Sequence, residues 1–228
     1  MSQSMLVAID GPAGSGKSSV SRAAAEQLGF GILDTGAAYR ALAWASLESG
    51  MNLDDEDQIL ALLDRWQYRS TLRGAQQVAV AFSDAARATD VTALIRTPEL
   101  SSQVSRVSKH PVVRERLNTM FRELVASSGL PGVVIEGRDI TTVVAPNAPV
   151  RILMTASPSV RAARRAGELS GLTHEQVLAD IEARDARHTR AGDSLTPAPG
   201  VAQAAASDLN HEPSVPAGGK IADAEQAA

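Results

Sequence analysis

The sequence contains no cysteine, no long apolar run, and only three lysines among its 22 basic residues. The lack of cysteine excludes disulfides, thiol catalysis and thiolate metal sites, so any bound metal would have oxygen ligands. No stretch approaches the ~18 consecutive apolar residues of a membrane span. The N-terminal MSQSMLVAIDG reaches a glycine-rich loop too soon for a cleaved signal peptide. We therefore expect a cytoplasmic protein.

An excess of positive charge is also missing. The formal net charge is −4, which gives no general electrostatic reason to bind nucleic acid or an anionic membrane. The expected partners are therefore small molecules. Arginine carries nearly all the positive charge and suits bidentate phosphate recognition, but coding bias explains most of its excess. Only arginines within motifs are informative.

The length and composition predict one α/β domain. A chain of 228 residues with 44% hydrophobic content can bury one substantial core, with room for a small inserted subdomain. Strand-like and helix-like segments alternate at the start: a strand at 5–9, a helix after it, a strand at 30–33 and a helix over 37–46. This alternation predicts a parallel sheet.

The most specific motif follows the first strand. It reads G-P-A-G-S-G-K-S and matches the P-loop pattern G-x-x-x-x-G-K-[ST]. Glycines let backbone N–H groups surround a phosphate chain, the lysine reaches the outer phosphates, and the serine hydroxyl can ligate Mg²⁺. The motif predicts a bound nucleoside triphosphate. The residues that it assigns to this ligand are Gly11, Pro12, Ala13, Gly14, Ser15, Gly16, Lys17, Ser18 and Ser19.

Polar residues gather where the predicted parallel strands end. Asp10 follows the first strand, Asp34-Thr35-Gly36 the second, and Glu136-Gly137-Arg138-Asp139 a strand at 132–135. A further strand is predicted at 150–154. Ligands of open α/β sheets bind beyond the carboxyl ends of the strands, so these groups indicate one site.

The rest of the chain predicts an inserted lobe, further helices and an irregular tail. Short alternating runs around a glycine turn predict an antiparallel hairpin at 68–82, within an inserted lobe at about 67–95. Helices are expected at 97–108, after Pro111, at about 158–169 and at 173–187. Residues 191–228 are rich in Ala, Pro and Gly and are expected to be irregular, without a strand.

Taken together, the motifs resemble the bacterial cytidylate kinase family. The resemblance runs from about residue 5 to 185 and includes the strings LDTGAAYRALA, IRTPE, VSRVSKHPVVRERL, GVVIEGRDITTVVAPNAPVRILMTAS, RAARR and IEARD. It implies a three-layer P-loop NTPase fold with a parallel central sheet. A kinase domain would span 1–190, with a nucleoside-monophosphate-binding insert and a helical lid at about 158–190. The implied reaction moves the γ-phosphoryl group of ATP to CMP or dCMP, with Mg²⁺.

The resemblance also implies residue roles. Lys17 would hold ATP phosphates, Ser18 would ligate Mg²⁺, and Glu136 would orient the waters of the metal. Arg40 and Arg138 would clamp the CMP phosphate, and Arg164 and Arg184 would contact phosphates after lid closure. Positions matching the ribose and base site are Thr35, Tyr39, Ser105, Arg114 and Asp139. Arg96 is either a structural residue or a further contact to CMP. A monomer is expected, because such enzymes close around substrates by lid motion.

Three features depart from the family pattern. His188 stands where the family has an aspartate near the ribose, Thr141 replaces a glycine, and a late strand and closing helix are not recognisable. Two alternatives therefore stay open. One is a kinase of another monophosphate or small metabolite, and the other is a nucleotide-binding protein that has lost catalysis. The intact Lys17, Ser18, Arg40 and Arg138 argue against the second.

Overall fold

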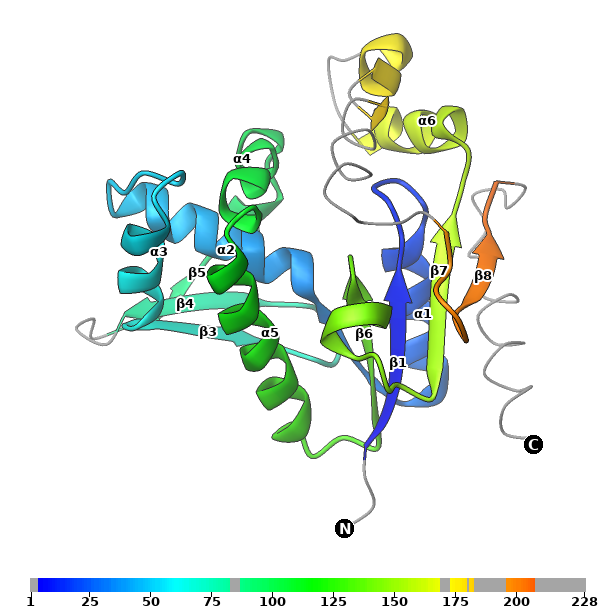
Figure 1. Ribbon diagram of the computed structural model, residues 1–228, viewed down its shortest axis with the longest axis horizontal. Helices are drawn as coiled ribbons and strands as arrows, with labels where there is room; N and C mark the ends of the chain where they lie inside the picture. The colour runs from blue at the N-terminus through cyan, green and yellow to red at the C-terminus, as the bar shows by residue number, and fades with distance from the viewer. Residues whose placement is uncertain (1–3, 83–86, 169–172, 180, 183–195, 208–228) are drawn as a thin grey trace. The chain divides into compact units, whose positions relative to one another are not determined.

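The computed structural model describes residues 4–82, 87–168, 173–179, 181–182 and 196–207 (Figure 1). The chain divides into two compact units. Unit 1 comprises residues 1–32 and 130–228, and unit 2 comprises residues 33–129. Unit 2 is thus inserted in the sequence between two segments of unit 1, and it contains the predicted lobe at 67–95.

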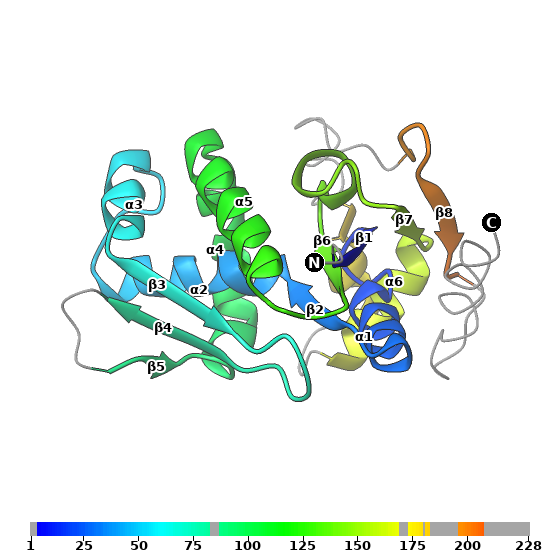
Figure 2. The same ribbon diagram turned by 90° about the horizontal axis from the view of Figure 1, so that it is seen from below.

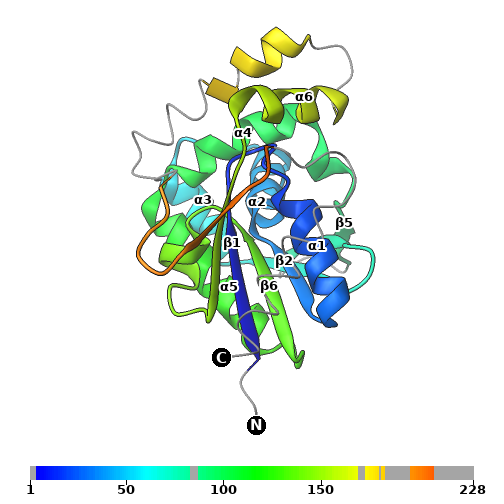
Figure 3. The same ribbon diagram turned by 90° about the vertical axis from the view of Figure 1, so that its right-hand side faces the viewer.

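Unit 1 is built on a five-stranded sheet in the order β2-β6-β1-β7-β8, flanked by helices (Figures 1 and 3). Its strands are β1 (Met5–Asp10), β2 (Gly31–Asp34, which ends just past the unit boundary), β6 (Gly132–Gly137), β7 (Val150–Thr155) and β8 (Ala202–Ala205). Strand β1 is parallel to β6 and β7, and β7 is parallel to β8. The predicted α/β fold with a parallel central sheet is confirmed.

The core of unit 1 forms between this sheet and α1 (Lys17–Leu28). Val20 and Ala25 of α1 pack in one apolar cluster with strand residues such as Val134 and Ile152. Central strands of a parallel sheet are covered on both faces, which explains their nearly continuous apolar runs. Helix α1 ends at Gly29, whose left-handed φ of 67° lets its N–H bond back to the last turn.

Strand β8 corrects one expectation. The tail at 191–228 was expected to lack a strand, yet Ala202–Ala205 pair with β7 from Ile152 to Thr155. The Ala206 N–H continues the ladder with a 2.7 Å bond to the Thr155 carbonyl. The prediction was wrong because alanine has low intrinsic strand preference, and pairing with β7 overrides that preference.

Unit 2 consists of helices and a small antiparallel sheet, β3-β4-β5 (Figure 2). Its elements are α2 (Thr35–Glu48), α3 (Glu56–Leu63), β3 (Trp66–Ser70), β4 (Val78–Phe82), β5 (Thr89–Asp90), η1 (Leu94–Arg96), α4 (Pro98–Ser108) and α5 (Pro111–Ala126). The β3–β4 pair confirms the predicted hairpin. Helix α2 contacts β4, η1 and α4, and α3 contacts β3 and α5.

Side-chain caps fix where several unit 2 helices begin. Asp34 accepts the Ala37 N–H at α2, Asp55 accepts the Gln58 N–H at α3, and Thr97 accepts the Leu100 N–H at α4. Each cap satisfies a first-turn donor that has no partner within its helix. The cap at Asp34 starts α2 two residues before the predicted start at 37.

The second segment of unit 1 adds η2 (Ile140–Val144), a single π-type turn, and α6 (Pro158–Glu168). Residues 174–179 and 181–182 are also helical, and Val177 and Ile181 pack on Ala162 of α6. Of the predicted helix at 173–187, residues 180 and 183–187 lie outside the described residues. Among the described helices, none is both long and apolar enough to cross a membrane.

Candidate functional site

The P-loop lies between β1 and α1, as predicted. The Ser15 N–H donates to the Pro12 carbonyl at 3.2 Å, and Gly16 begins the helix with a φ of 88°. No acidic residue occupies the first turn of α1, and no side chain caps its start. The positive end of the helix dipole and its first N–H groups therefore favour an anion at this end.

Gly14 is required by both conformation and space. Its φ is +77°, and a Cβ there would lie 2.8 Å from the Arg161 carbonyl oxygen. Any other residue would be strained and would push α6 away from the loop. The shape of the loop thus depends on the main chain.

Ser18 and Glu136 meet at the start of α1. The Ser18 hydroxyl donates to Glu136 Oε2 at 2.8 Å, and the Glu136 residue is only 2% exposed at the end of β6. A hydroxyl beside a buried carboxylate suits Mg²⁺, which prefers oxygen ligands and keeps waters and substrate phosphates in its shell. No group of three or more His, Asp or Glu side chains within the described ranges could hold a metal unaided.

Arg138 and Asp139 directly follow β6. Both residues are partly buried, and Asp139 has a left-handed backbone with φ 50° and ψ 22°. Within the described residues it is the only non-glycine residue with positive φ. Strand β6 pairs with β1 up to Asp10 and Gly137, so this turn and the P-loop leave the sheet at the same edge.

The arginines of α6 are held by main-chain carbonyls. Arg161 is 2% exposed, and its Nε donates to the Ala156 carbonyl at 3.0 Å. The Arg164 Nη2 donates to the Ala206 carbonyl at 2.6 Å, just after β8. The Arg164 Nη1 lies 3.6 Å from the point that a Cβ on Gly16 would occupy. Arg164 therefore lies beside the P-loop, consistent with its predicted contact to ATP phosphates.

In unit 2, Arg40 pairs with Asp34 across the start of α2. Its Nη2 donates to Asp34 Oδ2 at 2.9 Å, while Asp34 Oδ1 accepts the Ala37 N–H. The Arg40 Nε is buried and has no hydrogen-bond partner among the described residues. A partly buried guanidinium with an unused donor is suited to a phosphate oxygen.

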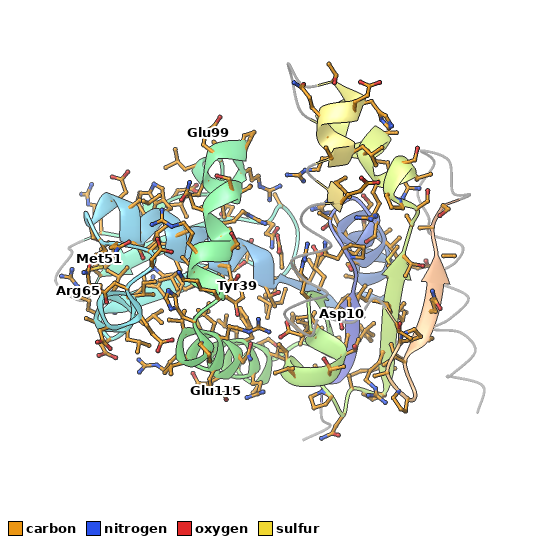
Figure 4. All side chains as sticks on the ribbon, turned by 45° about the horizontal axis from the view of Figure 1, so that its top comes forward. Asp10, Tyr39, Met51, Arg65, Glu99 and Glu115 are labelled. Atoms are coloured by element: carbon orange, nitrogen blue, oxygen red, sulfur yellow. The ribbon has the colours of Figure 1, made fainter. Side chains whose placement is uncertain are left out.

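The other predicted acceptor residues also lie in unit 2. Thr35 is buried at the start of α2, and the Tyr39 ring packs 6.3 Å from that of Phe121 (Figure 4). Ser105 is exposed on α4, and Arg114 is partly buried on α5. The exposed Arg96 donates to Gln76 Oε1 at 3.4 Å.

Asp54 and Tyr68 in unit 2 both have shifted pKa values. Hydrogen bonds from Arg106 and then Lys109 hold the pKa of the Asp54 carboxyl well below its usual range. Burial raises the pKa of the Tyr68 hydroxyl far above its usual value, against a smaller opposing effect of the Ser70 hydroxyl. Tyr68 is therefore neutral at physiological pH.

Comparison with known proteins identifies the family. A family model described as cytidylate kinase matches residues 7–215. The chain belongs to the cytidylate kinase family.

The relatives are similar over most of their length. A cytidylate kinase from Streptomyces avermitilis is 45% identical over 183 residues, which is 80% of this chain and 76% of that protein. A cytidylate kinase from Desulfitobacterium hafniense is 42% identical over 189 residues, with 81% and 78% covered. The predicted family and an ATP-using kinase activity are thereby confirmed.

Solved structures at lower identity share the fold. TT1252 from Thermus thermophilus gives a TM-score of 0.50 at 19% identity, with 98% of each chain covered. A shikimate kinase from Bacteroides thetaiotaomicron gives a TM-score of 0.50 at 13% identity, with 98% of this chain and 99% of that chain covered. These matches support the fold alone.

Some cytidylate kinase motif residues lie outside the described ranges. Arg184 and His188 are among them, so the predicted phosphate contact of Arg184 stays a prediction. The sequence interpretation missed the partnership of Asp34 with Arg40. An Asp at a strand end, three residues before a helical N–H, is the signal for such a cap.

Proposed function

We propose that the protein transfers the γ-phosphoryl group of ATP to CMP or dCMP, giving ADP and CDP or dCDP. The observation that carries the proposal is the arrangement at one sheet edge of unit 1. There the P-loop follows β1, and the Arg138-Asp139 turn follows β6. This supplies cationic groups for a triphosphate and for a second phosphate from neighbouring strands.

The donor nucleotide would be held mainly by the P-loop. Lys17 and the amides of residues 14–18 would bind the β- and γ-phosphates. Arg164 lies beside Gly16 and would add a guanidinium to the same phosphates. Arg184 is proposed to contact the same phosphates when the lid at 158–190 closes. The closed lid would exclude bulk water from the phosphates while charge develops on them.

Magnesium is proposed at Ser18. The Ser18 hydroxyl would be its protein ligand, and the buried Glu136 carboxylate would orient waters of its shell. When bound, the ion would neutralise charge on the transferring phosphates.

The acceptor would be bound through its phosphate and its base. Arg40 and Arg138 would bind the CMP phosphate. Thr35, Tyr39, Ser105, Arg114 and Asp139 are proposed at the ribose and base, and Arg96 is proposed to contact CMP. A carboxylate or hydroxyl that accepts from the exocyclic amine of cytosine would leave the uracil oxygen unpaired. Such buried mispairing gives large discrimination.

In phosphoryl transfer these residues would position the two substrates and stabilise negative charge. The acceptor phosphate must approach the γ-phosphorus in line, against the repulsion of two anions. Lys17, Arg40 and Arg138 would reduce that repulsion and stabilise the negative charge that develops on the leaving oxygen of ADP. We further propose that the protein acts as a cytoplasmic monomer.

One assay tests the proposal. ADP release from Mg-ATP is measured with CMP, dCMP, UMP and AMP as acceptors, and we expect turnover with CMP and dCMP. No turnover with any acceptor, despite ATP binding, would exclude the kinase activity. A preference for AMP would overturn the cytidine assignment and leave the kinase class intact.

A variant tests the acceptor assignment separately. Arg138→Ala should raise the KM for CMP and lower kcat together, because the same phosphate is bound in the ground state and the transition state. Unchanged kinetics would mean that the acceptor phosphate binds elsewhere.

A further inference from the structure

Asp10 forms a buried clamp between the end of β1 and the start of η2. The residue is 7% exposed, and Figure 4 labels it on β1 beside the η2 turn. Its Oδ1 accepts the Ile140 N–H at 2.7 Å, and its Oδ2 accepts the Thr141 N–H at 2.9 Å. The Thr141 hydroxyl donates to the same Oδ2 at 2.5 Å. A carboxylate this buried is stable only when such donors surround it.

The clamp lies between the two parts of the proposed reaction centre in unit 1. Asp10 is followed at once by Gly11 of the P-loop. Ile140 and Thr141 follow directly after Arg138 and Asp139. The clamp therefore joins the start of η2, directly after the Arg138-Asp139 turn, to the start of the phosphate loop by hydrogen bonds, and the side chains of Ile140 and Val144 in η2 are buried as well.

The turn needs such a restraint. Asp139 occupies the left-handed region, which is unfavourable for a residue with a Cβ. The Val144 N–H bonds to the Asp139 carbonyl at 3.2 Å, and the Ala145 N–H bonds to the Ile140 carbonyl at 2.8 Å. These bonds close η2 behind the turn, and the bonds to Asp10 hold its beginning.

Thr141 supplies a side-chain donor to this clamp, and it is 3% exposed. Its carbonyl also accepts from Arg151 Nη1 at 3.4 Å, and Arg151 Nη2 donates to the Pro199 carbonyl at 3.2 Å. The residue is thus held on two sides.

We propose that Thr141 is a positioning residue for the acceptor phosphate. Its hydroxyl, acting through Asp10, holds Arg138 at the distance from the P-loop that in-line transfer requires. The inference rests on the proposed function, because it takes Arg138 as the arginine that binds the acceptor. Small displacements of an aligned group reduce rates by up to ~10²-fold.

Thr141→Val tests this, because valine keeps the shape of threonine and removes the hydroxyl. We expect kcat/KM for CMP to fall about 10-fold, with the KM for ATP within about two-fold of the wild-type value. Thr141→Ser restores the hydroxyl and should recover most of the loss. The matched control is Thr142→Val, the same change at the exposed neighbour, which should behave as wild type.

Urea unfolding of each variant separates positioning from stability. A lower midpoint for Thr141→Val with unchanged kinetics would overturn the proposal and leave the hydroxyl a purely structural role. An equal rise in the KM values for ATP and CMP would also overturn it, since the P-loop itself would then have moved. If Thr141→Val does not fold, Thr141→Ala compared with Thr141→Ser gives the same contrast.

The two hypotheses fail differently. Absence of CMP phosphorylation by the wild-type protein would reject the proposed function. Wild-type activity with Thr141→Val kinetics unchanged would reject only the positioning role.

Discussion

In unit 1 the phosphate loop takes its shape from the main chain, whereas in unit 2 the candidate acceptor arginine is held by a side chain. Gly14 and Gly16 adopt positive φ, and Arg161 and Arg164 of α6 donate to the main-chain carbonyls of Ala156 and Ala206. Arg40 is instead held by the Asp34 carboxylate, with a quarter of its side chain exposed. A site shaped by main chain restricts the sequence to glycine at set positions. A site held by an ion pair leaves a much weaker pattern in the sequence.

Loss of the charge in the phosphate loop should have the largest effect. Lys17→Ala should lower kcat for ADP formation with CMP by ~10²–10³-fold, since removing one group that stabilises developing charge costs about that much. Steady-state kinetics at saturating Mg-ATP measures it. Lys109→Ala is the control, because Lys109 pairs with Asp54 on the surface of unit 2. A Lys17 variant with more than a tenth of the wild-type kcat would contradict this role.

Distortion of the loop main chain comes next. Gly14→Ala should raise the KM for ATP ~10-fold or more, because a left-handed non-glycine residue costs ~1–3 kcal/mol and its Cβ would crowd the Arg161 carbonyl. Gly74→Ala is matched to it, with φ +68° and open space around the new Cβ. That variant should lose ~1 kcal/mol of stability and keep its KM. If Gly14→Ala and Gly74→Ala changed the KM for ATP equally, crowding at the phosphate loop would not determine ATP binding.

The side-chain half of the comparison is tested by Arg40→Lys. Lysine keeps the charge but loses the fork that can bond Asp34 and a phosphate together, so the KM for CMP should rise ~10-fold. The KM for ATP should stay within two-fold. Arg69→Lys, on the exposed side of β3, serves as the control. An equal change in both KM values would remove Arg40 from the acceptor site.

The smallest effect concerns Tyr68, whose burial raises its pKa. Above pH ~10 the unfolded chain loses the Tyr68 proton while the folded chain keeps it, so the free energy of unfolding falls as pH rises. Tyr68→Phe lacks this loss. Between pH 8 and 10.5 its free energy of unfolding should fall by up to about 0.8 kcal/mol less than that of the wild type, measured in urea. Equal losses would mean that Tyr68 ionises normally in the folded protein.

The parts predicted best from the sequence are those with local causes. Glycines and a β-branched strand predict the P-loop, and the Gly74 turn predicts the β3–β4 hairpin. Each depends on residues close together in the chain. The side chains of the candidate site were also predicted by type and motif, because Lys17, Ser18 and Arg138 lie within short continuous patterns.

The parts that could not be predicted depend on distant partners. Strand β8 exists because Ala202–Ala205 lie along β7, fifty residues away in the sequence. The bond from Ser18 to Glu136 and the clamp of Asp10 on Thr141 join residues more than a hundred positions apart. No local pattern encodes such pairs, since each partner alone is an ordinary polar residue at the end of an element.

The carbonyl of Ala206 has a consequence for mutational scanning. Arg164 is bound there by a main-chain oxygen, so almost every side chain at position 206 would leave that acceptor in place. Proline is different: it would keep the carbonyl but remove the N–H that bonds to the Thr155 carbonyl. A substitution scan along β8 would therefore underestimate this strand, whereas a deletion of residues 202–206 would remove both the strand and the anchor of the arginine beside the phosphate loop.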